Sequence, residues 1–317
     1  MSTAINSFIP MDRRHALVRG APLADRTSGA ALFADISGFT PLTEALAAAL
    51  NPQRGAEELS ALLDQVYAAL TAEIDRYGGS VIGFSGDAIT CWFDRDHGIR
   101  AITCATELQS VMRVFATLSL AGGVQAALGI KVAVSIGPAR RFLVGDPAIR
   151  HIEVLAGATI DRLATAERQA KRGEIVLVAE DAEQLASAIE TTELRVAEES
   201  GVRVAVVGRI LAPANPAPWP ELPDTIITPD TARPWLLPAV FERLQGAHGL
   251  FVNELRPAVA LFVGFGDLDY DGDDRAGEQL NDYVRWVQRV LARYEGVLLD
   301  ITMGDKGGYL YAVFGLP

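Results

Sequence analysis

The sequence predicts an α/β fold in which helices pack against a mixed sheet, followed by a partial second copy of the same unit. Two observations indicate this architecture. Residue periodicity along the chain gives the order strand, helices, hairpin, helix, strands, helix and strand. Short signals from the first unit then recur near the end of the chain. Half of the 317 residues are hydrophobic, which is sufficient for a sizeable core in about two domains.

The first unit opens with a strand, two helices and a hairpin. Ala30–Asp35 is an apolar run typical of a buried strand, and Thr43–Leu50 and Ala56–Tyr77 show helical spacing. In the longer helix, apolar residues recur every three or four positions and form one face: Leu59, Leu62, Leu63, Val66, Leu70 and Ile74. Val81–Phe84 and Ile89–Phe93 then predict a hairpin.

Later elements alternate between helix and strand before a proline-rich stretch. They are a helix from Gly98 to Thr117, strands over Ile130–Ile136 and from Pro138 to Val144, a helix over Ile160–Lys171, a strand over Glu174–Val178, and a strand-like stretch over Leu194–Ile210. Eight of the sixteen prolines lie between Ala212 and Pro238, which predicts a stiff, extended connector without a helix. Trp219 and Trp235 in this connector are expected to pack on a domain surface.

An internal repeat predicts the domain organisation. Arg76–Gly79 followed by Gly86-Asp87 recurs as Arg293–Gly296 followed by Gly304-Asp305. The second copy holds only a strand, a helix and a hairpin, so we expect it to be truncated, with further C-terminal domains missing from this chain. The predicted boundaries are an N-terminal segment (1–27), a first domain (28–211), a proline-rich linker (212–250) and the start of a second domain (251–317).

Composition and charge exclude several classes of partner. The net charge of −12, without a basic patch, argues against nucleic acid and against an anionic membrane surface. No signal peptide is evident, and the apolar stretch Leu118–Ile136 is too interrupted for a membrane span. Cys91 and Cys104 lack metal-ligand spacing, and free thiols are typical of a cytoplasmic protein.

Two aspartates offer the clearest chemistry in the chain. Asp35 ends the first apolar strand, and Asp87 follows Gly86 near the tip of the hairpin. Each alone has an ordinary structural explanation, since Asp35 could cap a helix and Asp87 could be a turn residue. Together, two carboxylates beside the glycine-containing turn at Gly38 predict a site for Mg²⁺ and a metal-bound triphosphate.

These residues also carry a family resemblance. Ala31–Thr43 and Tyr77–Phe93 resemble the first catalytic domain of class III nucleotidyl cyclases, most closely the soluble, bicarbonate-regulated adenylyl cyclases. Phe251–Pro317 is similar to the opening of their second domain. The resemblance implies a ferredoxin-like α/β (α+β) core, pseudo-symmetric pairing of two cyclase domains, and conversion of ATP or GTP to the cyclic monophosphate and pyrophosphate.

The resemblance also implies roles for individual residues. It assigns Asp35 and Asp87 to two Mg²⁺ or Mn²⁺ ions, with the main chain of Ile36 as a further metal contact. One ion would activate the ribose 3′-hydroxyl, and the other would hold the triphosphate. Gly86 would lie in the nucleotide site, and backbone N–H groups of the turn into the next helix would contact phosphate: Ser37, Gly38, Phe39 and Thr40.

The second copy departs from the family pattern. Gly264 stands where the first copy has Asp35, although Asp305 remains, so we expect one active site, with its metals on the first domain. The acidic cluster over Asp267–Asp274 lacks the closing glutamate of a calcium loop and is interpreted as a solvated loop.

Residues that these cyclases take from the partner domain are also altered. Their transition-state asparagine and arginine lie on a late helix of the second domain, and the matching first-domain helix here carries Asp161 and Thr165. No lysine precedes Lys306 where a purine-reading lysine is expected. Asp300 in that region suits the N–H donors of guanine, so the choice between ATP and GTP stays open.

The resemblance also bears on regulation by bicarbonate and on the activity of the chain. The bicarbonate response of the soluble cyclases relies on a lysine and an arginine whose places are taken by Gly83 and Ala164. Arg140, Arg141 and Arg150 are nearby in sequence and could neutralise an anion, but we favour the interpretation that they are ordinary surface arginines. The leading hypothesis is a cyclase module that forms cyclic AMP from ATP and is weakly active or inactive as this chain alone. The alternative is a non-catalytic, nucleotide-binding regulatory module of a larger signalling protein.

Overall fold

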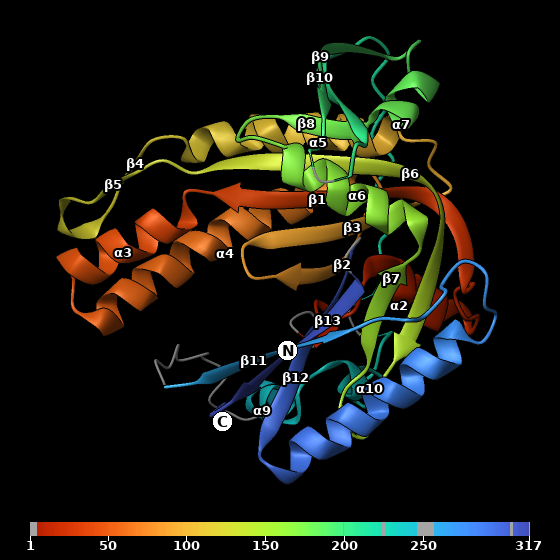
Figure 1. Cartoon of the computed structure of the whole chain (residues 1–317). Coiled ribbons are helices and arrows are strands. Elements are labelled where there is room, and N and C mark those ends of the chain that lie inside the picture. Colours follow the sequence, from red (N-terminus) through yellow and green to blue (C-terminus); the bar gives the residue numbers. More distant parts are fainter. Residues whose placement is uncertain (1–4, 199, 224–225, 246–256, 305–306, 317) are drawn as a thin grey trace.

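A long mixed sheet organises the first two thirds of the chain in the computed structural model (Figure 1), which describes residues 5–198, 200–223, 226–245, 257–304 and 307–316. The strand order is β2-β3-β1-β6-β8-β10-β9, and β7 pairs with the far end of β6. The strands are β1 (Arg26–Ser37), β2 (Ser80–Ser85), β3 (Ala88–Asp94), β6 (Gly129–Val144), β7 (Ile152–Ala156), β8 (Ile175–Val178), β9 (Ile189–Val196) and β10 (Arg203–Ile210).

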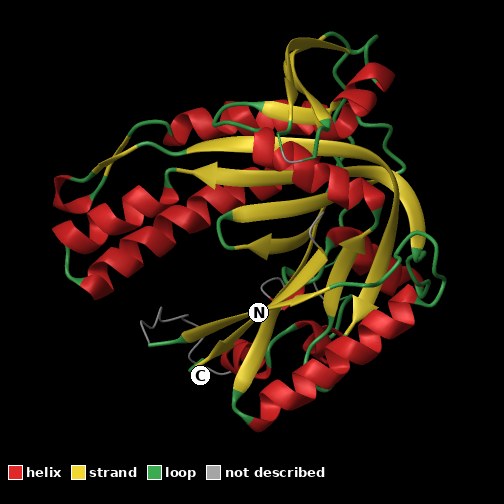
Figure 2. Ribbon diagram, in the orientation of Figure 1, coloured by secondary structure: helices red, strands yellow, loops and turns green. Residues whose placement is uncertain are grey.

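Helices cover both faces of this sheet (Figure 2). On one face, α3 (Phe39–Ala49), α4 (Pro52–Arg76) and α5 (Ile99–Met112) bury apolar side chains with the strands in one large cluster. On the other face, α6 (Ala158–Gln169) packs Ile160 and Leu163 into a second cluster. The smaller elements are η1 (Arg113–Phe115), β4 (Leu118–Ser119), η2 (Ala121–Gly123), β5 (Gln125–Ala126) and α7 (Ala179–Gln184).

The second part of the chain repeats the first strand, a helix and the hairpin. It contains β11 (Val259–Phe265), α10 (Ala276–Arg293), β12 (Gly296–Gly304) and β13 (Gly307–Phe314). The order β11-β13-β12 and its antiparallel pairing match β1-β3-β2. The fold class predicted from the sequence, a mixed sheet with packed helices and a partial second copy, is therefore confirmed.

The two parts share a hydrophobic core. Residues of β6 and β7, including Phe142 and Val154, are buried in one cluster with Leu280 and Val284 of α10 and with apolar residues of β12 and β13. Because apolar surface from both parts is removed from water in the same cluster, the second part is packed against the first.

The acidic loop before α10 also joins the two parts. The Asp271 carboxylate accepts a hydrogen bond of 2.8 Å from the Ala158 N–H at the start of α6, and Arg26 forms a 2.6 Å ion pair with Asp274. The Arg140 guanidinium, which is 2% exposed, donates to the carbonyls of Tyr270 and Asp273. The loop is thus a connection between the parts as well as an acidic surface.

Two predicted strand boundaries were wrong. Ile130–Ile136 and Pro138–Val144 form one continuous strand, β6, because the pairing with β1 continues through Gly137 as far as Arg140, where the pairing with β7 begins. The stretch Leu194–Ile210 is instead two strands, β9 and β10, which form a hairpin.

The proline-rich connector is also not extended throughout. It contains α8 (Pro229–Ala232) and η3 (Arg233–Trp235), and α9 (Pro238–Gln245) follows. Proline is tolerated at the first helical position because that N–H has no helical partner, and the Thr228 side chain caps α8. The packing of both tryptophans is confirmed: Trp235 is 5% exposed, and Trp219 donates a 2.7 Å hydrogen bond to the Gly79 carbonyl.

A buried ionic network fixes the N-terminal helix α2 (Met11–Arg19) to the sheet. The Arg141 guanidinium pairs with Asp12 and lies 2.6 Å from Glu153, which also accepts a 2.9 Å bond from Arg13. All four side chains are buried. The interpretation of Arg140 and Arg141 as surface arginines was therefore wrong, because Arg140 is 2% exposed and pairs with Asp25, and Arg141 is 6% exposed within this network. Among the described residues, no helix is both long and apolar enough to cross a membrane.

We predict that Arg141→Met destabilises the fold by about 3–5 kcal/mol, because it leaves buried carboxylates without their cation. Chemical denaturation measures the free energy of unfolding. Arg209→Met is the control, since Arg209 forms an exposed pair with Glu190 and its loss should change stability little. Equal stability of the two variants would contradict the structural role of the network.

Candidate active site

The predicted aspartates come together at the edge of the first hairpin. β1 and β3 are antiparallel neighbours in which Asp35 lies opposite Ala88. The Ile36 N–H donates a 3.1 Å hydrogen bond to the Asp87 carbonyl, so that backbone pairing places the two aspartates side by side. The apolar run of β1 buries Leu32 and Ala34 and leaves Asp35 at the accessible end of the strand.

A lysine on the neighbouring strand completes this group of charges. Lys131 lies opposite Asp35 in the β1–β6 register, and its Nζ is 3.2 Å from Asp35 Oδ2 and 2.5 Å from Glu167 Oε1. The sequence analysis did not identify Lys131. A single cation within the apolar run Ile130–Ile136 was a signal that could have drawn attention to it.

The environment disfavours charge on Asp87. Burial raises the pKa of the Asp87 carboxyl, and the nearby negative charge of Asp35 raises it further, whereas Lys131 acts in the opposite direction. Burial, together with both carboxylates, raises the pKa of Tyr67 to about 12. The Tyr67 hydroxyl donates a 3.0 Å hydrogen bond to the Gly86 carbonyl, which ties the hairpin tip to α4.

The turn after β1 is shaped for an anion. Gly38 has φ +95° and precedes α3, which begins at Phe39. A side chain at this position would also meet the Ala127 carbonyl oxygen, at 2.5 Å from its Cβ. The first N–H groups of a helix lack intrahelical acceptors, so the turn over Ser37–Thr40 presents donors next to Asp35.

The donor set fits a hard divalent cation. Asp35 and Asp87 supply carboxylate oxygens, and Ile36 can offer only its carbonyl, because its N–H is bonded to Asp87. Among the described residues, no group of three or more histidine, cysteine or acidic side chains forms a metal cluster. Mg²⁺ needs few protein ligands, because it retains water and binds phosphate oxygens, so this sparse set is compatible with a metal-nucleotide site.

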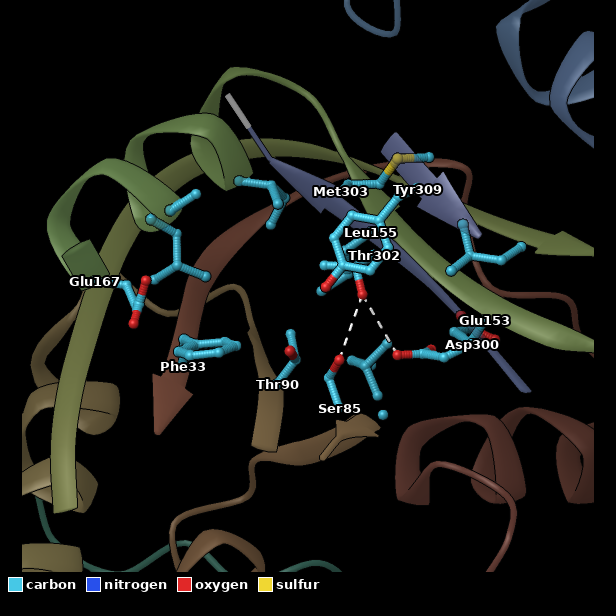
Figure 3. A pocket seen from close by; sticks show the side chains of 16 residues that line it. Phe33, Ser85, Thr90, Glu153, Leu155, Glu167, Asp300, Thr302, Met303 and Tyr309 are labelled. Carbon is cyan, nitrogen blue, oxygen red and sulfur yellow. Dashed lines mark hydrogen bonds between the residues drawn. The ribbon is translucent and has the colours of Figure 1, made fainter. Parts of the chain in front are cut away.

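A separate cavity of about 230 Å³ lies between the two parts of the chain (Figure 3). Asp300 and Thr302 of β12 line it together with Ser85 of β2, and Thr302 lies within 3.5 Å of both. Gly83 and Ala164 also line it, and the described residues of its lining include no basic side chain. A small anion would therefore find no cationic partner among these residues.

The second-part residues singled out from the sequence are placed differently from the aspartate pair. Asp300 faces this cavity beside Gly83, and burial raises the pKa of its carboxyl. Gly264 of β11 pairs with Tyr309 as Asp35 pairs with Ala88, so the second copy has no carboxylate at this position. Asp305 lies outside the described residues.

The remaining predicted residues belong to α6 and to the junction between the parts. The Thr165 hydroxyl donates to the Asp161 carbonyl of the same helix, at 3.0 Å. Arg150, which we expected at the surface, donates to the Leu299 carbonyl across the junction, and burial lowers its pKa.

We predict that Asp87→Asn stabilises the metal-free protein at neutral pH. A carboxyl whose pKa is raised by folding costs stability above that pKa, and the cost disappears as the pH falls through it. The variant's melting temperature should thus exceed that of the parent at neutral pH and converge with it in acid. Asp282→Asn, on an exposed position of α10, is the control. A lower melting temperature for Asp87→Asn at neutral pH would refute this reading of the charges.

Comparison with curated proteins finds similarity to adenylate cyclases. The chain is 23% identical over 329 residues to adenylate cyclase type 10 of Oryctolagus cuniculus and 24% identical over 332 residues to that of Homo sapiens. Each alignment covers 93% of this chain and 20% of the relative, so the chain spans about a fifth of their length. No family model matches the sequence.

Solved structures show the same fold. The guanylyl cyclase Cya2 aligns with a TM-score of 0.50 and 23% identity, over 62% of this chain and 98% of that one. A bacterial light-regulated adenylyl cyclase aligns with a TM-score of 0.50 and 17% identity, over 67% of this chain and 62% of the other. The chain is therefore similar over 93% of its length to adenylate cyclase type 10 and has the fold of class III adenylyl and guanylyl cyclase domains.

Proposed function

We propose that this chain is a nucleotidyl cyclase module that forms cyclic AMP and pyrophosphate from ATP. The observation that carries the proposal is the β1–β3 pairing, which sets Asp35 opposite Ala88 and joins the Ile36 N–H to the Asp87 carbonyl, beside the Gly38 turn. The choice of ATP rests on the relatives, which are adenylate cyclases. The free, buried cysteines Cys91 and Cys104 support our proposal of a cytoplasmic location.

The reaction is an intramolecular phosphoryl transfer. A bond forms between the ribose 3′ oxygen and the α-phosphorus while the bond from that phosphorus to pyrophosphate breaks. Two bound Mg²⁺ or Mn²⁺ ions would supply activation of the 3′-hydroxyl and neutralisation of phosphate charge. Positioning and charge stabilisation account for most of the catalysis in this chemistry.

The chain's own residues have separate tasks in this proposal. Asp35, Asp87 and the Ile36 carbonyl hold the metals. The N–H groups of the Ser37–Thr40 turn bind phosphate oxygens. Lys131 lies next to Asp35, where its ammonium can contact the same triphosphate. Tyr67 holds the Gly86 carbonyl and with it the position of the hairpin tip.

The second part of the chain offers less to catalysis. Pairing of two cyclase domains would bring partner residues to the nucleotide, but Gly264 replaces the first carboxylate of the second copy. On α6, Asp161 and Thr165 stand in place of the family's asparagine and arginine. This last observation favours the alternative function, a nucleotide-binding regulatory module without catalysis.

We predict that residues 1–317 bind a manganese nucleotide and form cyclic AMP at a rate on the order of a hundred- to a thousand-fold below that of a complete site, since one lost transition-state donor typically costs that much. Chromatography of products from ATP and GTP measures the rate. Robust turnover would show that Asp161 and Thr165 do not limit the site. Binding without any turnover would favour the regulatory module.

Asp35→Asn and Asp87→Asn should each abolish the slow turnover and weaken Mn²⁺ binding, while the variants stay folded. Asparagine preserves the shape of aspartate but removes the charge that a divalent cation needs. Mn²⁺ binding is followed by electron paramagnetic resonance of the free ion, and folding by circular dichroism. Unchanged Mn²⁺ affinity in both variants would overturn the metal site, and with it the proposed function.

A further inference from the structure

Lys131 divides one positive charge between two carboxylates. Its Nζ lies 2.5 Å from Glu167 Oε1 and 3.2 Å from Asp35 Oδ2. The three side chains have similar exposure, between 23% and 24%, so all can respond to a ligand at the surface. Of the described basic side chains, Lys131 forms an ion pair with both of these carboxylates.

The backbone fixes this arrangement. Asp35 and Lys131 are direct cross-strand neighbours in the β1–β6 pair, and Glu167 reaches Lys131 from α6, which packs on the same face of β6. Glu167 also lines one end of the cavity between the two parts, beside Phe33 (Figure 3). Glu167 forms its ion pair with Lys131, so we expect Glu167 to affect the Asp35–Asp87 pair through that lysine.

We propose that Glu167 is a positioning residue that sets the charge of the proposed metal-nucleotide site by holding Lys131 away from full pairing with Asp35. The inference rests on the proposed function. Asp35, Asp87 and Glu167 bring three negative charges, and Lys131 brings one positive charge. Glu167 therefore raises the affinity of this cluster of charges for a divalent cation and lowers its affinity for a free triphosphate.

This assignment predicts opposite effects on two ligands. Glu167→Gln removes one negative charge, while its amide oxygen can still accept a hydrogen bond from Lys131. Metal-free ATP should then bind more tightly, because Lys131 is less neutralised, and Mn²⁺ alone should bind more weakly. Partly exposed ion pairs are worth less than about 1 kcal/mol, so each affinity should change roughly two- to five-fold.

The experiment compares Glu167→Gln with Glu174→Gln in residues 1–317. Glu174 is a matched control, because its carboxylate is 21% exposed and forms a 2.6 Å ion pair with Arg195 at the end of β8. Electron paramagnetic resonance measures Mn²⁺ binding without nucleotide, and calorimetry measures ATP binding in the presence of a chelator. Both shifts should shrink as salt is raised, since they are electrostatic.

The outcomes separate this inference from the proposed function. Opposite shifts in Glu167→Gln, absent from Glu174→Gln, support the positioning role, because a purely structural defect would weaken both ligands together. Parallel shifts, or shifts equal to those of the control, overturn the inference and leave the cyclase proposal in place. A parent chain that binds neither Mn²⁺ nor ATP overturns both.

Discussion

The pairing of β1 with its two neighbours is the constraint on which the site depends. One backbone hydrogen bond, from the Ile36 N–H to the Asp87 carbonyl, brings Asp87 next to the end of β1 that carries Asp35, near enough for the two carboxylates to interact. The register with β6 then sets Lys131 against Asp35. Burial raises the pKa of the Asp87 carboxyl, and the neighbouring negative charge of Asp35 raises it further. Carboxyls with a raised pKa are typical of functional sites, and a ligand that binds to them stabilises the folded protein.

The second part of the chain contributes packing more clearly than chemistry. It shares a hydrophobic cluster with β6 and β7, and the loop before α10 caps α6 through Asp271. α6 also carries Glu167, so the contact between the two parts lies on the same helix as the residue that pairs with Lys131 beside the proposed site. The alignment with adenylate cyclase type 10 covers 93% of this chain and therefore extends over both parts.

Local sequence patterns predicted much of this structure. The apolar run before Asp35, the glycines around Asp87 and the repeated arginine-tyrosine signal were enough to predict the hairpin, the repeat and the fold class. Lys131 could not be paired with Asp35 in the same way, because strand register is a long-range property. The burial of Arg140 and Arg141 depends on Asp25 and Asp12, which are distant in sequence, and on Glu153 of the neighbouring strand β7. The short helices of the connector were missed because proline was treated only as a helix breaker.

Whether Asp35 and Asp87 hold the metal is tested by the position of manganese in a crystal of residues 1–317 grown with Mn²⁺ and a non-hydrolysable ATP analogue. Anomalous diffraction locates the metal independently of the protein atoms. We predict manganese in contact with both Asp35 and Asp87, with the triphosphate over the turn at Gly38. A bound analogue whose manganese contacts neither carboxylate would contradict it.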